Sequence, residues 1–292
     1  MRKYNYTLPD EVRPSRRDMH YGMPVGRNKQ EKEIKMAYLE LNALSTILCG
    51  SFSAKIYLPE MNMLYLDDEK HEKKYPVLWL LHNEGGTALD WSKTMAEKCA
   101  EEYGIFIIAP DAQHSICTNM DYGPKYEDFL ATEFPQICKN NLPVSDDPAR
   151  NFIGGAGTGA YGAVKAAIKH PEVFSKCIAM DGIFDMERIC KLAMEGKPTG
   201  IFHKEESLKA VFGDITAIKG SGHDVYALAE DCRKGQFYVT GAKGSCYADE
   251  RKRLVESLKE RAVYVETTGE IMDFTEPMVL KRAVGWLCGE NS

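Results

Sequence analysis

The segment from Asn151 to His170, NFIGGAGTGAYGAVKAAIKH, constrains the fold of this chain more than any other. Its first residues are apolar, a cluster of five glycines follows, and small apolar residues then recur at helical spacing. This order predicts a buried strand, a sharp turn and a helix, because glycine accepts backbone conformations that other residues avoid. A strand, turn and helix in this order form the unit from which alternating α/β folds are built.

The glycine turn has the spacing of a known catalytic motif without its reactive residue. In the sequence G-x-S-x-G, a serine lies on a strained elbow between a strand and a helix, and its neighbours must be small. Residues 155–159 read Gly-Ala-Gly-Thr-Gly, so the small neighbours are present and Gly157 stands at the serine position. The frame of a nucleophile elbow is present, and the nucleophile is missing.

Apolar runs and helical patterns alternate along the rest of the chain. The runs at 76–81 and 105–108 are typical of strands buried on both faces of a parallel sheet. Further strands are predicted at 36–41, 53–58, 177–180, 237–240 and 262–267, and helices at 90–103, 126–137, 251–258 and 277–287. The alternation predicts an α/β fold with a doubly wound, mostly parallel sheet of about eight strands and helices on both faces.

The chain is interpreted as one domain with an extension. Residues 1–30 are polar and basic without a sustained period, and we expect an N-terminal extension there. Residues 31–292 are predicted to form one domain. Within it, residues 182–233 mix short helical patterns with glycines, as a cap or lid would.

Composition favours a cytoplasmic protein that binds neither nucleic acid nor membrane. The 292 residues carry a formal net charge of -6, which gives no electrostatic reason to bind nucleic acid or an anionic membrane. No apolar run approaches the roughly 20 residues of a membrane span, and the first residues lack an apolar signal-peptide core. The nine cysteines form no C-x-x-C pair, so we expect reduced thiols and neither a metal site nor a cofactor.

Four segments together resemble one enzyme family. They are LWLLHNEGGTALDW, EEYGIFIIAPDAQHSICTNMDYG, NFIGGAGTGAYGAVKAAIKHPEVFSKCIAMDG and FYVTGAKGS. Their order and spacing, from about residue 35 to residue 288, are similar to the esterase D and tributyrin esterase group of α/β hydrolases, which includes S-formylglutathione hydrolases. The resemblance implies the α/β-hydrolase fold, a serine carboxylesterase with a Ser, Asp, His triad in that chain order, and a possible homodimer.

All three triad positions implied by the resemblance are substituted. The serine falls on Gly157, the aspartate near Gly244, and the histidine on Ile271 or, with a shift of one residue, on Met272. Acyl transfer by this route needs a hydroxyl, an imidazole and a carboxylate together. None of these groups remains, so we expect the acyl-enzyme route of the family to be closed.

The resemblance also implies an oxyanion hole and a pocket. The backbone N–H groups of Glu84 and Thr158 would be the oxyanion donors, and the Glu84 carboxylate would oppose a developing negative charge unless it turns away. The candidate pocket residues are His82, Asn83, His114, Ser115 and Tyr161. We expect His82 to hold its loop by hydrogen bonds and His223 to lie near a helix start.

Two functional hypotheses follow from these substitutions. The first is a non-catalytic pseudo-esterase that binds a small ligand or a partner through the inherited pocket. The second is an active carboxylic-ester hydrolase with a relocated nucleophile. The candidates for that nucleophile are Ser115 and Cys117, with Ser245 and Cys246 nearby.

A third, weaker hypothesis is a nucleotide site at the glycine turn. Residues 157–162 match G-x-G-x-x-G, follow a predicted strand and open a helix, and Asp181 stands about 20 residues further on, as the dinucleotide fingerprint requires. Against this hypothesis, two glycines already precede the match, and the flanking segments follow the esterase pattern without gaps.

Overall fold

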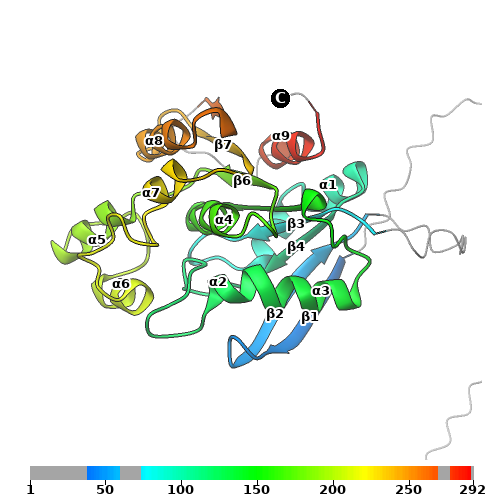
Figure 1. Ribbon diagram of the computed structural model, residues 1–292, viewed down its shortest axis with the longest axis horizontal. Helices are drawn as coiled ribbons and strands as arrows, with labels where there is room; N and C mark the ends of the chain where they lie inside the picture. Colours follow the sequence, from blue (N-terminus) through cyan, green and yellow to red (C-terminus); the bar gives the residue numbers. More distant parts are fainter. Residues whose placement is uncertain (1–37, 60–73, 269–276, 291–292) are drawn as a thin grey trace, which may run out of the picture. The chain divides into compact units, whose positions relative to one another are not determined.

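The computed structural model describes residues 38–59, 74–268 and 277–290, which contain an eight-stranded sheet and the helices that cover it (Figure 1). The strand order is β1-β2-β4-β3-β5-β6-β7-β8. The strands are β1 (Tyr38–Ser45), β2 (Gly50–Tyr57), β3 (Val77–Leu81), β4 (Phe106–Pro110), β5 (Asn151–Ala156), β6 (Lys176–Met180), β7 (Gln236–Ala242) and β8 (Ala262–Thr267). β2 is antiparallel to β1 and β4, and the remaining pairings are parallel. The predicted doubly wound, mostly parallel sheet is confirmed.

The central strands are buried on both faces because their side chains are apolar throughout. Every residue of β3 and of β4 is buried. In the neighbouring β5, Gly154 and Gly155 pair with Leu80 and Leu81 of β3. A Cβ added at Gly155 would lie 2.5 Å from the carbonyl carbon of Gly159, so the helix after β5 packs this closely only because glycine stands there.

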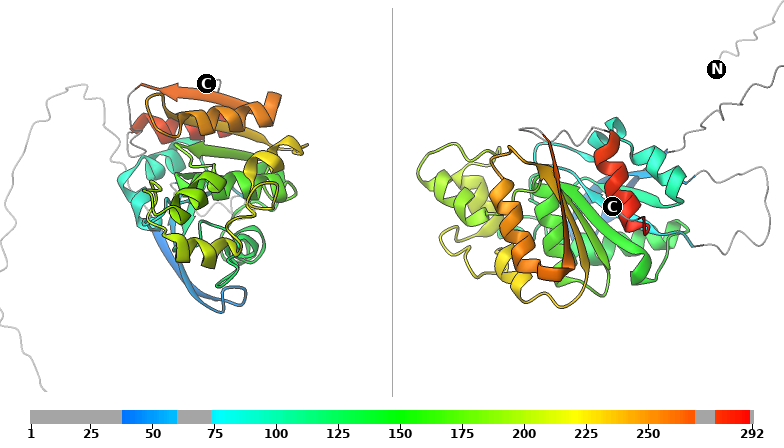
Figure 2. Two further views of the ribbon diagram at one scale, coloured as in Figure 1. Left: turned by 90° about the vertical axis from the view of Figure 1, so that its left-hand side faces the viewer. Right: turned by 90° about the horizontal axis from the view of Figure 1, so that it is seen from above.

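Helices cover the sheet in two layers. One apolar cluster joins α1 (Ala96–Tyr103) and α9 (Pro277–Leu287) to one face, and another joins α3 (Phe134–Asn141), α4 (Thr158–Lys169) and α8 (Ala248–Leu258) to the other. Alternate residues of β3 belong to the two clusters, as the period of a strand requires. Figure 2 shows α8 and α9 on opposite sides of β7 and β8. Among the described residues, no helix is long and apolar enough to cross a membrane.

One predicted helix is interrupted. The helix expected over 90–103 is split into the 3-10 turn η2 (Ala88–Lys93) and α1. The split falls at Thr94, whose backbone is extended and whose hydroxyl accepts a hydrogen bond from the N–H of Ala96 at 3.1 Å. The N–H of Ala96 is in the first turn of α1 and has no acceptor within that helix, so the Thr94 hydroxyl supplies one. In a continuous helix, this N–H would bond a carbonyl of the preceding turn.

The region 182–233 is helical in part, as the mixed pattern indicated. It contains α5 (Met186–Met194), α6 (Glu205–Phe212) and α7 (Val225–Glu230). The helix predicted at 126–137 is longer than expected and consists of α2 (Tyr126–Asp128), the π-helical turn η3 (Phe129–Glu133) and α3. The expected extension over 1–30 and the positions Ile271 and Met272 lie outside the described residues.

Candidate active site

The elbow between β5 and α4 keeps a backbone conformation that few residues adopt. Gly157 has φ 56° and ψ -120°. Its N–H donates to the carbonyl of Met180 at 3.0 Å, and its carbonyl accepts from the N–H of Ile183 at 3.2 Å. The elbow is therefore held by β6 and by the chain that follows β6. The strained geometry of a nucleophile turn is present at a residue with no side chain.

The side chain of Asn83 occupies the space where a serine side chain would begin. A Cβ added at Gly157 would collide with Asn83 Oδ1 and would lie 2.5 Å from Asn83 Cγ. Asn83 belongs to the loop after β3, where the oxyanion hole is expected. Asn83 and Gly157 are complementary in size, because the side-chain amide of Asn83 fills the volume that Gly157, without a side chain, leaves empty.

Both expected oxyanion donors are already hydrogen-bonded to side chains of the protein. The N–H of Thr158 donates to Asn83 Oδ1 at 3.0 Å, and the N–H of Glu84 donates to Thr158 Oγ1 at 2.8 Å. Thr158 is buried, so these bonds lie away from bulk water. An oxyanion hole functions when its N–H groups are free to bond the substrate oxygen on which negative charge develops. Here the amide oxygen of Asn83 and the hydroxyl of Thr158 take that place.

The carboxylate of Glu84 turns away from this hole and binds a histidine in the segment before α6 (Glu205–Phe212). Glu84 Oε1 is ion-paired with Nδ1 of His203, and both side chains are 3% exposed. Nε2 of His203 donates to the carbonyl of His114 at 2.8 Å. Burial lowers the pKa of His203, but the hydrogen bond and charge of Glu84 outweigh it, so the pKa is raised overall. The pair joins the loops after β3 and β4 to the segment before α6.

His82 holds its loop, and both of its ring nitrogens are occupied. Nε2 accepts from the N–H of Ala112 at 2.9 Å, so the proton of the neutral ring must be on Nδ1. Nδ1 then donates to the carbonyl of Asn83 at 2.7 Å. His82 is buried and bridges the loops after β3 and β4. This arrangement leaves it no free nitrogen for proton transfer.

At the end of β7, where the family aspartate is expected, the buried charge is a cation. Gly244 is exposed in the turn after β7. The guanidinium of Arg251, from α8, is fully buried; it donates to Asp181 Oδ1 at 2.7 Å and to the carbonyl of Ala242 at 2.5 Å. Burial raises the pKa of Asp181, and the charge of Arg251 opposes this rise. Asp181 is thus ion-paired with Arg251, whereas the aspartate of a catalytic triad binds and orients a histidine.

Of the four candidate replacement nucleophiles, Ser115, Cys117 and Ser245 are buried or hydrogen-bonded, whereas Cys246 is exposed. Ser115 is fully buried; its hydroxyl donates to the carbonyl of Ala112 at 2.6 Å and accepts from the N–H of Cys117 at 3.0 Å. Burial raises the pKa of the Cys117 thiol to about 12, so it stays protonated and weakly nucleophilic. Ser245 accepts from the N–H of Tyr247 at 3.3 Å. A reagent could reach Ser115 or Cys117 only after neighbouring groups move.

Two other candidate residues differ in exposure. Tyr161 is fully buried, and its hydroxyl donates to the carbonyl of His223 at 2.9 Å, so it faces the interior rather than a ligand. His223 precedes α7, whose N-cap is Asp224, as expected from its sequence context. His114 is exposed, and its ring lies 6.1 Å from that of His203.

The glycines of the nucleotide motif serve packing. A Cβ added at Gly159 would lie 2.6 Å from the carbonyl oxygen of Leu81, and one at Gly162 would collide with the side chain of Cys117. These glycines therefore let α4 approach β3 and the loop after β4. The first N–H of α4, that of Thr158, is taken by Asn83. A phosphate would have to displace this side chain, so the geometry disfavours the nucleotide hypothesis.

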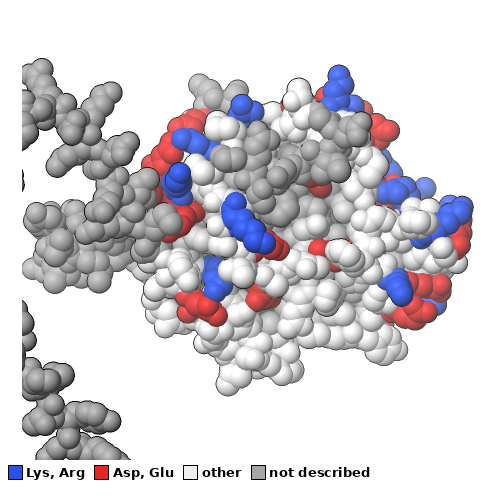
Figure 3. All heavy atoms as spheres, turned by 180° about the vertical axis from the view of Figure 1, so that it is seen from behind, with Lys and Arg blue, Asp and Glu red and all other residues white. Residues whose placement is uncertain are grey.

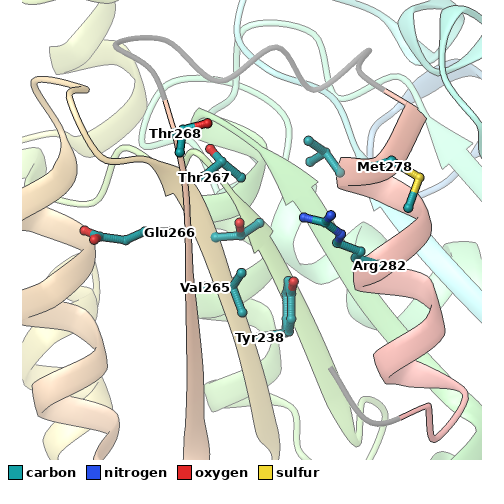
Figure 4. A pocket seen from close by; sticks show the side chains of 9 residues that line it. Tyr238, Val265, Glu266, Thr267, Thr268, Met278 and Arg282 are labelled. Atoms are coloured by element: carbon teal, nitrogen blue, oxygen red, sulfur yellow. The ribbon is translucent and has the colours of Figure 1, made fainter.

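Two hollows of about 290 Å³ each lie at the carboxyl edge of the sheet, and neither is lined by Gly157 or Thr158. The first lies between β7, β8 and α9 and is lined by threonines together with Glu266 and Arg282 (Figure 4). The second lies between the β1–β2 hairpin and the loops after β3 and β4. Among the described residues, no cluster of three or more His, Cys, Asp or Glu could hold a metal ion.

His203 and Arg251 are the two site residues that sequence reasoning missed. His203 stands beside the exposed Phe202 in a segment without clear periodicity. Arg251 belongs to an amphipathic helix in which an arginine normally lies at the surface. Neither carries a local signal, because each acquires its partner from a loop distant in sequence.

The strand order, the elbow at Gly157 and the adjoining loop define a protein with the α/β-hydrolase fold of esterases. Residues 45–230 match the model of the Esterase family, described as "Putative esterase", and the chain belongs to this family.

Relatives and solved structures agree with this assignment. An acetyl esterase of Caldicellulosiruptor saccharolyticus is 22% identical over 242 residues, 79% of this chain and 89% of the relative. The fluorophosphonate-binding serine hydrolase FphF of Staphylococcus aureus superposes with a TM-score of 0.76 at 23% identity, covering 87% of this chain and 99% of that one. The S-formylglutathione hydrolase FrmB of Staphylococcus aureus gives a TM-score of 0.74 at 24% identity, covering 87% and 100%. At these identities the superpositions establish the fold.

Proposed function

We propose that this chain is a non-catalytic member of the esterase family, which uses the inherited fold to bind a small ligand or a partner. The observation that carries the proposal is the closure of the former reaction centre by Asn83. Its side chain fills the position of the missing serine side chain and accepts the hydrogen bond of Thr158, an expected oxyanion donor. The substitution at Gly157 is therefore matched by a second change in the facing loop.

The closed oxyanion hole also bears on residual activity. Serine hydrolases that lose triad residues keep a residual acceleration that comes from the oxyanion hole and substrate binding. One oxyanion donor contributes about 10²–10³ to kcat. In this chain, the N–H groups of both Glu84 and Thr158 are bonded internally. We therefore expect less residual activity than an esterase with only its serine removed would retain.

Hydrolysis of p-nitrophenyl acetate, p-nitrophenyl butyrate and S-formylglutathione by the purified protein tests the proposal. The expected rate is that of buffer alone. Turnover that is unchanged in the variants Thr158→Val, Ser115→Ala and Cys117→Ala would indicate a contaminating esterase. Turnover that one of these substitutions abolishes would contradict a non-catalytic role.

The alternative, an active carboxylic-ester hydrolase with a relocated nucleophile, draws on the chemistry of the relatives. A fluorophosphonate probe for serines and iodoacetamide for cysteines, followed by peptide mapping, separate the two proposals. Labelling of Ser115 or Cys117 in the native protein would support the alternative. We expect iodoacetamide to reach only exposed thiols such as those of Cys49, Cys246 and Cys288.

A cytoplasmic location and a homodimer are further proposals, which follow from the composition and the family. Light scattering of the purified protein measures the mass in solution against the 32.8 kDa of one chain. A mass near twice that value is the expected result for a homodimer.

A further inference from the structure

A hollow between β7, β8 and α9 combines a cationic side chain with a buried hydroxyl that has no partner. We call it the C-terminal pocket, and its volume is about 290 Å³. Its wall includes Tyr238, Thr240, Val265, Thr267, Val279 and Arg282, and all of its lining residues lie within the described ranges. The volume is near the lower limit for small-molecule sites and suits one aromatic ring with a polar substituent.

The cation of the C-terminal pocket is Arg282. Figure 4 shows its side chain pointing from α9 toward the strands. Within the described residues, Arg282 forms no ion pair and no side-chain hydrogen bond. Its neighbour Lys281, by contrast, is ion-paired with Glu102 at 2.7 Å. A guanidinium without a partner presents N–H donors in a fixed fork, which matches two oxygens of a carboxylate or phosphate group.

The acidic residue that borders the pocket does not neutralise Arg282. Glu266 lies between Val265 and Thr267 on β8, so the alternation of the strand places its side chain on the opposite face of the sheet. Figure 4 shows this side chain pointing away from Arg282. Its carboxylate is ion-paired with Lys252 of α8 at 3.3 Å. The wall of the pocket therefore carries a positive charge without a counter-charge of its own.

The hydroxyl of Thr267 is a second, independent sign of a ligand. Its Oγ1 is buried and has no hydrogen-bond partner within the described residues. A buried hydroxyl without a hydrogen bond costs free energy, so native proteins normally supply a partner, which can be a bound molecule. Tyr238 adds another hydroxyl to the wall. Burial raises the pKa of Tyr238, with the nearby charge of Arg282 opposing the rise, so this hydroxyl is a neutral donor.

We propose that the C-terminal pocket binds a small organic anion through a carboxylate or phosphate group. Arg282 would bind two oxygens of that group, and the hydroxyls of Thr267 and Tyr238 would donate to it. The carbon part of the ligand would pack on Val265 and Val279, which line the same pocket and belong to the apolar layer under α9. A neutral ligand would leave the charge of Arg282 unpaired.

The charge distribution of the molecule favours a small anion over a polyanion. On the face that Figure 3 shows, acidic side chains lie beside most of the basic ones, and the coloured residues form no broad basic patch. The whole chain has a formal net charge of -6. A polyanion such as nucleic acid is bound by an extended basic surface, so the ligand is an anion that fits within the pocket.

Titration calorimetry of the full chain tests the proposal, with benzoate, phenyl phosphate, inorganic phosphate and benzamide as probes. We expect saturable binding of benzoate, of phenyl phosphate or of both, which identifies the bound group as a carboxylate, a phosphate or either. Benzamide has the shape of benzoate without its charge, and inorganic phosphate lacks the ring. Each should bind at least about tenfold more weakly than the tighter organic anion.

Two variants and a control assign the binding to this pocket. Arg282 is exposed, so Arg282→Gln should fold as the native chain does, and Thr267→Val replaces the unbonded hydroxyl by a methyl group. We expect each variant to bind the organic anion about tenfold more weakly, the loss expected for one hydrogen bond to a charged group. Lys281→Gln removes one positive charge from the same helix outside the pocket lining and should bind as the native chain does.

Three results would overturn the proposal. They are the absence of saturable binding of both organic anions, binding of benzamide or inorganic phosphate as tight as that of the organic anion, and anion binding that survives both Arg282→Gln and Thr267→Val. The proposal goes beyond the proposed function, because neither Gly157 nor Thr158 lines this pocket. Hydrolysis assays and binding assays therefore fail independently, and a chain that hydrolyses esters could still bind an anion here.

Discussion

At the scale of single residues, Asn83 makes two contacts at the turn between β5 and α4. Its amide fills the volume next to Gly157, and its oxygen accepts from the N–H of Thr158 at 3.0 Å. Without this side chain, the space beside Gly157 would be empty and the N–H of Thr158 would be unbonded, and both cost stability. The loop after β3 and the elbow are therefore mutually adapted.

The substitution Gly157→Ser is expected to destabilise the protein. Its Cβ would collide with Asn83, and φ 56° is a conformation that costs a residue with a side chain about 1–3 kcal/mol. Urea denaturation measures the loss. The double variant Asn83→Gly, Gly157→Ser removes the collision and should regain that part of the lost stability. A double-mutant cycle reports this gain as a coupling energy between the two positions. A Gly157→Ser variant as stable as the native chain would show that Asn83 moves freely.

Replacement of Thr158 by valine is expected to lower stability by about 1–3 kcal/mol, because the buried N–H of Glu84 loses its acceptor. Valine has nearly the same shape, so packing is conserved. Thr158→Ser keeps the hydroxyl and serves as the control, with a smaller loss. Equal losses in the two variants, measured by urea denaturation, would contradict a role for the hydrogen bond.

At the scale of elements, buried charge pairs tie the loops at the carboxyl edge to the helices around them. Glu84 and His203 connect the loop after β3 to the segment before α6, and Arg251 connects α8 to the ends of β6 and β7. Each pair lies where an esterase would position catalytic groups. Charged groups at these positions now hold segments together.

The Glu84–His203 pair predicts a pH dependence of stability. The pKa of His203 is raised in the folded state, so its contribution is full below the unfolded value near 6.5 and is lost as pH rises through the folded pKa. Urea midpoints from about pH 6 to about pH 9 should fall more steeply for the native chain than for His203→Gln, which cannot titrate.

The comparison of the native chain with His203→Gln also distinguishes the effect of His203 from the effects of His170 and His223. His170, whose pKa Glu127 also raises, contributes equally to both proteins in the same window. Burial, with the charge of Lys165, lowers the pKa of His223 to about 4, so its contribution is lost only as pH falls from about 6.5 towards 4. Parallel curves for the native chain and His203→Gln above pH 6.5 would contradict the prediction.

Removal of the charge of Arg251 is expected to destabilise the protein strongly. Arg251→Met would leave Asp181, whose side chain is 21% exposed, beside an apolar group, and breaking such a pair costs about 3 kcal/mol. Urea denaturation gives the free energy of unfolding of Arg251→Met and of the double variant Arg251→Met, Asp181→Asn. The difference between the two separates the cost of the unpaired Asp181 charge from the cost of lost packing. We expect the double variant to recover part of the loss.

At the scale of the whole molecule, the sheet brings together strand ends that are far apart in sequence. β5 and β7 deliver Gly157 and the Gly244 turn to one edge, and α8 supplies Arg251 there. A triad is a property of this assembly, since its members come from different strand ends. The fold does not depend on the triad positions, because its core rests on apolar packing.

Restoring the nucleophile alone should therefore not restore activity. The double variant Asn83→Gly, Gly157→Ser would open the hole and supply a hydroxyl, but the histidine and aspartate positions implied by the family resemblance would still carry Ile271 and Gly244. We expect no turnover of p-nitrophenyl acetate above buffer and no labelling of the introduced serine by a fluorophosphonate probe. A burst of p-nitrophenol would show that another group activates this serine.

The fold was largely predictable from the chain because its signals are local. The apolar runs of β3 and β4, the glycines before α4 and the periodicity of α9 are each contained in a short segment, and the structure confirms them. The break between η2 and α1 was missed, because it depends on one hydroxyl at Thr94.

The sequence alone determined the alternation of strands and helices, the family and the absence of a serine at position 157. Only the tertiary structure decided that Asn83 lies against Gly157 and bonds the N–H of Thr158, that Glu84 turns to His203 and that Arg251 binds Asp181. The physical reason is that patterns of burial follow the local period of the chain. Hydrogen bonds and ion pairs between distant loops depend on distances that exist only after the sheet has formed.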